Sequence, residues 1–99
     1  MGKRVRIWVD DERPAPDGYR RARSVNEAVE QIERAESAGD EVELLDLDHD
    51  LGSFACDGGD AIKLLDYLVE RGTLYPVRIH TQNPVGRQNM ERTLRRFWT

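Results

Sequence analysis

The chain has 99 residues, of which 38% are hydrophobic and 34% are charged. This length suits one compact domain, and the excess of acids over bases, 19 against 15, argues against a general nucleic-acid binder and against duplex DNA as a partner. No apolar run approaches the roughly 20 residues that cross a bilayer, and the first residues lack a signal-peptide pattern, so we expect a cytoplasmic protein without a membrane partner.

The first half of the chain predicts two strands and a helix. Residues 4–9 alternate Val5, Ile7 and Val9 with larger or charged side chains, which is typical of a strand. Residues 19–23 form a weaker candidate, rich in arginine, that suits a sheet edge. Residues 24–38 carry apolar side chains at helical spacing, begin with the capping box of Ser24 and Glu27, and are followed by a glycine.

The second half predicts two further strands and two further helices. Residues 42–47 are mostly apolar, as in a central strand buried on both faces, and residues 52–59 read as a loop. A helix is expected over residues 60–71 and a short strand over residues 76–81. Asn83 as N-cap and Pro84 at the first helical position then open a last helix.

The predicted order β, β, α, β, α, β, α requires a mainly parallel sheet in an α/β domain. In a sheet of order 2-1-3-4 the first and third strands are neighbours, and their connections leave in opposite directions. A crevice therefore opens at the carboxyl ends of these two strands, where ligands bind in this class of fold.

Acidic residues follow both of these strand ends. Asp10 and Asp11 come directly after the first strand, and Asp48 and Asp50 after the third. Carboxylates gathered in one place need a cation or hydrogen-bond donors to stay ionised, and a hard divalent ion such as Mg²⁺ prefers oxygen ligands. We therefore expect these four aspartates to hold Mg²⁺ or another divalent cation. The alternative is that they are turn-forming loop residues.

The carboxylate at the end of the third strand is ambiguous. Asp46 and Asp48 lie on the same side of the pleat, two residues apart. If the strand ended earlier, Asp46 would take the central place. We rank Asp48 first and Asp46 second.

These positions resemble the receiver domains of two-component signalling. The matching features are the pair Asp10-Asp11, Asp48 (or Asp46) after the third strand, and Thr81 at the end of the fourth. The resemblance implies a flavodoxin- or receiver-like three-layer α/β sandwich. The loop over residues 12–18 is too short for the usual first crossover helix, and the fifth strand with its lysine is absent, so ordinary phospho-aspartate switching is not implied.

Two histidines refine the resemblance. His49 stands in L-D-H-D-L-G and His80 in I-H-T-Q-N-P, and the chain begins with W-V-D-D-E-R-P after its first residues. Together these motifs resemble one offshoot, the cyclic-phosphate processing receiver domain. That family implies action on cyclic phosphate groups, with a phosphate-containing small molecule or an RNA end as partner.

The residues offer the chemistry that such a reaction needs. A metal held by the aspartates would stabilise charge on the phosphoryl oxygens, and either His49 or His80 could be acid or base. Asp48 is a catalytic candidate as well as a ligand, because a carboxylate can also act as a covalent nucleophile. The expected phosphate contacts are Thr81, Asn83 at the helix N-terminus, Arg87 and Arg13.

Each of these roles has a plainer alternative. His49 alternates with its neighbouring aspartates and would then point away from them, His80 would be a partly buried structural histidine, and Arg87 would lie on a solvated helix face. The sequence thus leaves a metal-dependent phosphoesterase and a phosphate-sensing or protein-binding module without turnover as competing functions.

Overall fold

The structure is a computed structural model that describes residues 2–98. It contains four strands, three α-helices and one short 3₁₀-helix. In chain order these are β1 (Arg4–Val9), β2 (Tyr19–Ala22), α1 (Val25–Ser37), β3 (Glu41–Leu47), η1 (Gly52–Cys56), α2 (Ile62–Arg71), β4 (Val77–Ile79) and α3 (Pro84–Phe97). The predicted elements are all present; β4 is shorter than expected and leaves His80 and Thr81 just beyond its end, and η1 lies inside the predicted loop.

The strands form one parallel sheet in the order β2-β1-β3-β4. This confirms the predicted fold class and strand order. In the register of the sheet, Val9 of β1 lies beside Ala22 of β2 and Leu47 of β3, and Leu47 lies beside Ile79 of β4. The carboxyl ends of all four strands therefore reach the same edge.

Residues 10–18 join β1 to β2 without a helix, as predicted. Parallel neighbours usually need a longer crossover, because the chain must return to the start of the next strand. Here β2 begins level with Arg6, in the middle of β1, so the return is short.

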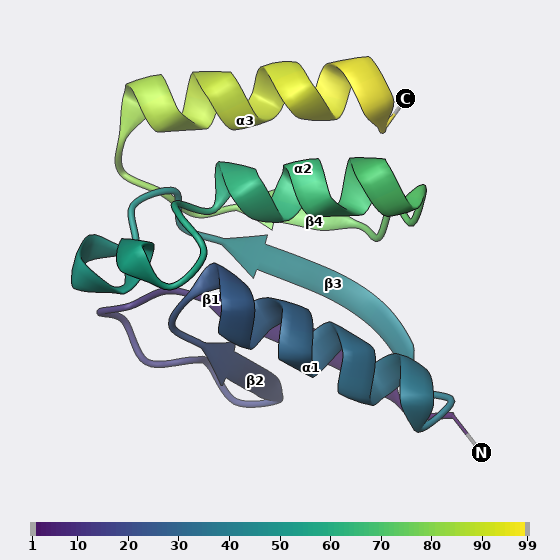
Figure 1. Ribbon diagram of the computed structural model, residues 1–99. Helices are drawn as coiled ribbons and strands as arrows, with labels where there is room; N and C mark the ends of the chain where they lie inside the picture. Colours follow the sequence, from purple (N-terminus) through teal and green to yellow (C-terminus); the bar gives the residue numbers. More distant parts are fainter. Residues whose placement is uncertain (1, 99) are drawn as a thin grey trace.

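All three helices pack on one face of the sheet (Figure 1). The side chains that alternate towards this face, together with the apolar stripes of the helices, make one core: Val5, Ile7, Val9, Ala22, Val25, Ala28, Ile32, Ala35, Val42, Leu45, Leu47, Leu51, Ala61, Leu64, Leu65, Leu68 and Met90. The domain therefore has two layers, one of helices and one of strands, whereas the receiver resemblance implied three. The opposite face loses its cover because the β1–β2 connection contains no helix.

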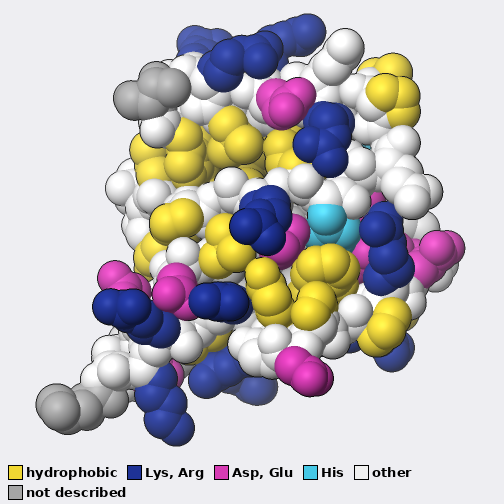
Figure 2. Space-filling view, turned by 180° about the vertical axis from the view of Figure 1, so that it is seen from behind, with side chains coloured by type: hydrophobic (Ala, Val, Ile, Leu, Met, Phe, Trp, Pro, Cys, Tyr) yellow, Lys and Arg dark blue, Asp and Glu magenta, His cyan; other side chains and the backbone are white. Residues whose placement is uncertain are grey.

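The uncovered face carries the other set of alternating side chains. Arg4, Arg6 and Trp8 of β1 point there, and they lie beside Glu41, Leu44 and Asp46 of β3. Figure 2 shows hydrophobic, basic and acidic side chains interleaved over this side of the molecule. Among residues 2–98 no helix has the length and apolar character that would span a bilayer.

Candidate functional site

Hydrogen bonds fix the strand ends beneath the predicted site. The backbone N–H of Asp10, directly after β1, donates to the carbonyl of Ala22 at 3.0 Å. The N–H of Asp48, directly after β3, donates to Val9 at 2.9 Å, and that of His80 donates to Leu47 at 2.9 Å. These bonds extend the parallel ladder by one residue, so the side chains of all three residues have fixed starting points.

A hollow of about 230 Å³ lies above these strand ends. The loops after β1 and β3 line it, as the topology predicted, and the loop after β4 lines it as well. Its lining residues are Asp11, Glu12, Arg13, Asp48, Asp50, Gly52, Thr81, Gln82 and Asn83. The residues from distant parts of the sequence are thus brought to one place.

Asp10 forms the floor beside this hollow and is fully buried. Its Oδ1 accepts hydrogen bonds from the backbone N–H groups of Glu12 at 2.9 Å and Arg13 at 3.0 Å. Burial alone would raise the pKa of Asp10, but these two bonds and a bond from His80 together lower that pKa below its ordinary value. Asp10 is therefore held as a carboxylate.

His80 lies between two carboxylates. Its Nε2 is 3.0 Å from Oδ2 of Asp10, and its Nδ1 is 2.7 Å from Oδ1 of Asp46. The imidazole also stacks on the indole of Trp8, with ring centroids 3.8 Å apart and ring planes 5° apart. Three separate contacts therefore hold the ring.

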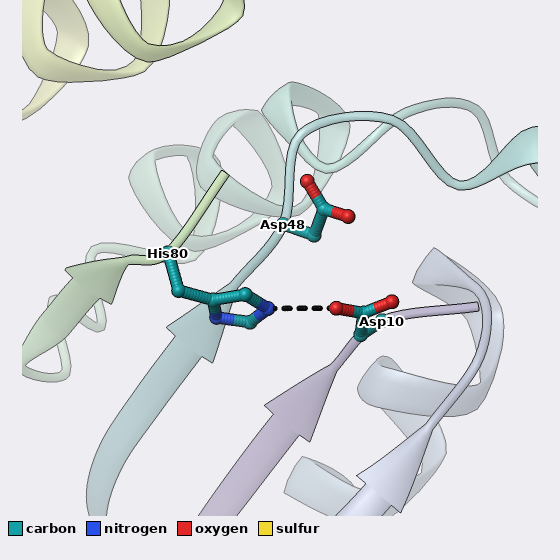
Figure 3. A group of neighbouring side chains, drawn as sticks. All are labelled: Asp10, Asp48 and His80. Carbon is teal, nitrogen blue, oxygen red and sulfur yellow. Dashed lines mark hydrogen bonds and ion pairs between the residues drawn. The ribbon is translucent and has the colours of Figure 1, made fainter. Parts of the chain in front are cut away.

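One ligand atom each from Asp10, Asp48 and His80 lies within 4.8 Å of the others, a spacing that fits a metal ion. Figure 3 shows the carboxylate of Asp48, at the end of β3, above the Asp10–His80 pair. Asp10 and His80 already bind one another, so the free ligand of this group is Asp48.

Asp11 is the second free carboxylate. In the part of the chain that the structure describes, the side chains of Asp11 and Asp48 have no hydrogen-bond or ion-pair partner, although both line the hollow. A carboxylate oxygen of Asp11 also lies against Cα of Gly52, in the loop after β3, so closely that a Cβ there would overlap it. Unpartnered carboxylates in one hollow fit the oxygen ligands that Mg²⁺ prefers.

Asp50 is less free than Asp48. It accepts hydrogen bonds from Nδ1 of His49 at 2.9 Å and from the amide of Asn83 at 2.9 Å, and these two bonds lower the pKa of Asp50. His49, Asp50 and Asp60 form a second group with metal-like spacing. Asp50 nevertheless faces the hollow and can contribute charge to it.

The two histidines differ in position. His49 is absent from the lining of the hollow, and its ring packs against Gly86 of α3. Its Nδ1 lies 2.9 Å from Asp50, so the alternative in which His49 points away from both neighbouring aspartates does not hold for Asp50. Of the two, only His80 lies beside Asp10 and Asp48.

Three of the four expected phosphate contacts line the hollow: Arg13, Thr81 and Asn83. The Nε of Arg13 is 3.4 Å from Asp10. The side chain of Asn83 caps α3 by accepting from the N–H groups of Val85 and Gly86, so those helix donors are already used.

Arg87 is the fourth expected contact and lies elsewhere. Its guanidinium donates to the backbone carbonyls of Ile79 at 3.1 Å and Thr81 at 3.3 Å. It is not part of the lining of the hollow and instead fixes the segment that carries His80 and Thr81.

Sequence reasoning missed several neighbours of the site. Glu12, Gly52 and Gln82 line the hollow, and Trp8, expected to be a packing residue, stacks on His80. For Trp8 a signal was present, because it alternates with Val5, Ile7 and Val9 and so had to face away from their core.

Comparison with protein-family models matches residues 5–96 to the cyclic-phosphate processing receiver domain. Searches of curated proteins and of solved structures found no match. The matched region contains every site residue described above. The chain therefore belongs to the family of cyclic-phosphate processing receiver domains.

Proposed function

We propose that the chain hydrolyses cyclic phosphodiester groups on nucleotides or RNA ends, in a reaction that depends on Mg²⁺ or a related divalent cation. One observation carries the proposal. The side chains of Asp11 and Asp48 line a hollow and have no hydrogen-bond or ion-pair partner among residues 2–98, and the guanidinium of Arg13 and the hydroxyl of Thr81 lie in the same lining.

The charge of the hollow supports a cation as the first ligand. Four carboxylates line it, from Asp11, Glu12, Asp48 and Asp50, against the single cationic side chain of Arg13 among its lining residues. A phosphate anion would be repelled by such a surface. A bound divalent cation would reverse that repulsion and stabilise the charge that develops on the phosphoryl oxygens.

The reaction forms a bond from a water oxygen to phosphorus and breaks one phosphorus–oxygen ester bond of the ring. The water gives up a proton, and the departing sugar oxygen takes one. We assign this proton exchange to His80, whose Nε2 faces Asp10 and Asp48. Arg13 and the Thr81 hydroxyl are the groups that would bind and orient the phosphate oxygens.

A phosphate-sensing module without turnover is the second candidate. It is favoured by the fact that both ring nitrogens of His80 already lie against carboxylates, which makes the ring a poor proton carrier unless one contact opens. In that case the same hollow would bind a cation and a phosphate and change partner binding instead of chemistry.

Incubation with Mg²⁺ and 2′,3′-cyclic nucleotides, or short RNAs that end in a cyclic phosphate, separates the two. We expect the wild-type protein to produce the monoester, Asp48→Asn to lose this activity, and Asp66→Asn, an exposed change on α2, to retain it. Absence of turnover on all substrates, together with Mg²⁺-dependent binding of the same compounds, would replace the hydrolase by the sensing module.

A further inference from the structure

Asp46 is a buried carboxylate that the proposed chemistry does not use. It is 2% exposed, and it points to the sheet face that no helix covers. Its Oδ1 lies 2.7 Å from Nδ1 of His80. Its Oδ2 accepts from the hydroxyl of Tyr19 at 3.4 Å and lies 4.0 Å from the guanidinium of Arg78.

These contacts argue against Asp46 as a metal ligand. Both of its oxygens have protein partners, whereas Asp11 and Asp48 have none among the described residues. Asp46 is also absent from the lining of the hollow and from the group formed by Asp10, Asp48 and His80. Its contact with the site passes through the imidazole ring.

Trp8 fixes the plane of that ring. The indole is anchored by its own N–H, which donates to the carbonyl of Arg13 at 3.1 Å, and the edge of Tyr19 packs against it. Stacking alone does not decide which ring nitrogen faces Asp10, because a half-turn about the ring axis keeps the same plane. Both nitrogens face carboxylates, which accept but cannot donate, and Asp46 makes the shorter of the two contacts, 2.7 Å against 3.0 Å for Asp10, so Asp46 is the stronger constraint on the orientation of the ring.

We propose that Asp46 is a positioning residue that holds the Nδ1–H of His80 and so directs Nε2 towards Asp10 and Asp48. Carboxylates that hold the far nitrogen of a functional histidine fix its tautomer and orientation in many sites. The role in catalysis rests on the proposed function, whereas the role in fixing the ring does not.

Nuclear magnetic resonance of the imidazole nitrogens tests the positioning directly. The chain contains two histidines, so a His49→Asn variant assigns the signals. We expect a protected Nδ1-bound proton for His80 in the wild type, loss of that signal in Asp46→Ala, and partial retention in Asp46→Asn, whose amide oxygen can still accept. Tyr19→Phe removes the hydrogen bond to the other oxygen of Asp46 and should leave the signal in place.

A residue that only stabilised the fold would not change the kinetics of folded protein. We expect Asp46→Ala to lower kcat by about 10- to 100-fold with little change in KM, Asp46→Asn to lie between it and the wild type, and Tyr19→Phe to match the wild type. Mn²⁺ affinity measured on the same samples gives a second readout and should fall in the same order.

Several results would overturn the proposal. An unprotected Nδ1 in the wild type would do so without any variant, even if Asp46→Ala failed to fold. An unchanged His80 signal in Asp46→Ala would also do so, as would a lost signal with kcat and Mn²⁺ affinity unchanged. If the wild type turned over no cyclic phosphate, the hydrolase would fail alone, and the His80 signal with the Mn²⁺ affinity would still decide the role of Asp46.

Discussion

The carboxylate of Asp10 lies 3.0 Å from Nε2 of His80, although 70 positions separate the two residues in the chain. Asp10 follows β1 and His80 follows β4, and β3 lies between these strands in the sheet. The contact therefore spans the end of β3 and closes the floor beneath Asp48 (Figure 3). This arrangement leaves Asp48 as the carboxylate of the group that a cation can reach.

Replacing Asp11 by Asn should distinguish the charge repulsion within the acidic hollow from the capacity of the hollow to bind a cation. Without metal, the loss of one of four clustered charges should leave the free energy of unfolding unchanged or slightly higher. With Mg²⁺ at 100 times its dissociation constant, the wild type should gain about 2.7 kcal/mol, and the variant much less.

Urea unfolding with Mg²⁺ and with a chelator measures both quantities. Asp66→Asn, on the exposed side of α2, is the matched control and should gain as much from Mg²⁺ as the wild type. An equal gain in Asp11→Asn would show that Asp11 is not a ligand.

Gly52→Ala should damage the site as well as the fold. Gly52 has φ +55°, where an L side chain costs about 1–2 kcal/mol, and its added Cβ would displace the carboxylate of Asp11. Gly18→Ala is the control, because Gly18 has φ +86° but open space around the new Cβ. We expect both variants to lose stability in urea unfolding and only Gly52→Ala to lose Mn²⁺ affinity; equal affinities would contradict the packing of Asp11 on this glycine.

Tyr75→Phe should remove a stabilising hydrogen bond whose contribution to the free energy of unfolding is lost at alkaline pH. The hydroxyl of Tyr75 donates to Glu36, and burial, with the charge and hydrogen bond of Glu36, raises the pKa of Tyr75 to about 12. Because the folded pKa lies above the unfolded value of 10.0, this stabilisation is fully present below pH 10.0 and is lost as the pH rises towards 12.

The free energy of unfolding of Tyr75→Phe should therefore be about 1 kcal/mol lower than that of the wild type at pH 7, and it should decline less steeply above pH 10. Glu36 responds in the opposite range. Its pKa is lowered, first by the Tyr75 bond, so its contribution is present above the ordinary value of 4.5 and is lost as the pH falls below it. Free energies of unfolding from pH 3 to pH 12 test both slopes, and parallel curves for the two proteins would refute the assignment.

Ser24→Ala should loosen the loop that borders the site. The buried Ser24 hydroxyl accepts from the N–H of Glu27 at 3.1 Å and donates to Asp57 at 2.7 Å, and so ties the start of α1 to the end of η1. Loss of this helix cap should cost about 1–2 kcal/mol, whereas Ser37→Ala, at the exposed end of α1, should cost little. Hydrogen exchange should increase around Asp57 in the first variant, and unchanged protection there would show that the cap does not hold the loop.

The sequence was sufficient to predict the sheet and the position of the acidic residues at its edge. Strand periodicity, helix caps and glycine stops gave the elements, and parallel topology then placed Asp10, Asp11 and Asp48 at one edge. The number of helices was also predicted, but the receiver resemblance did not indicate that all three would pack on one face of the sheet. The short β1–β2 connection was the residue-level sign that one face would be bare.

Side-chain direction was harder to predict than position. Arg87 stands in the first turn of α3, as expected, but the carbonyls of Ile79 and Thr81 compete for its guanidinium. His80 could not be distinguished from a structural histidine by sequence, because its two carboxylate partners come from β1 and β3. Such contacts depend on sheet register, which spacing along the chain does not encode.

We propose above that the acidic hollow binds a divalent cation together with a phosphate. Anomalous scattering from crystals soaked in Mn²⁺ and phosphate tests it most directly. We expect a manganese peak against the carboxylates of Asp11 and Asp48, with a phosphate beside Arg13 and Thr81. No peak there, or manganese confined to the group of His49, Asp50 and Asp60, would contradict a cation site in the hollow.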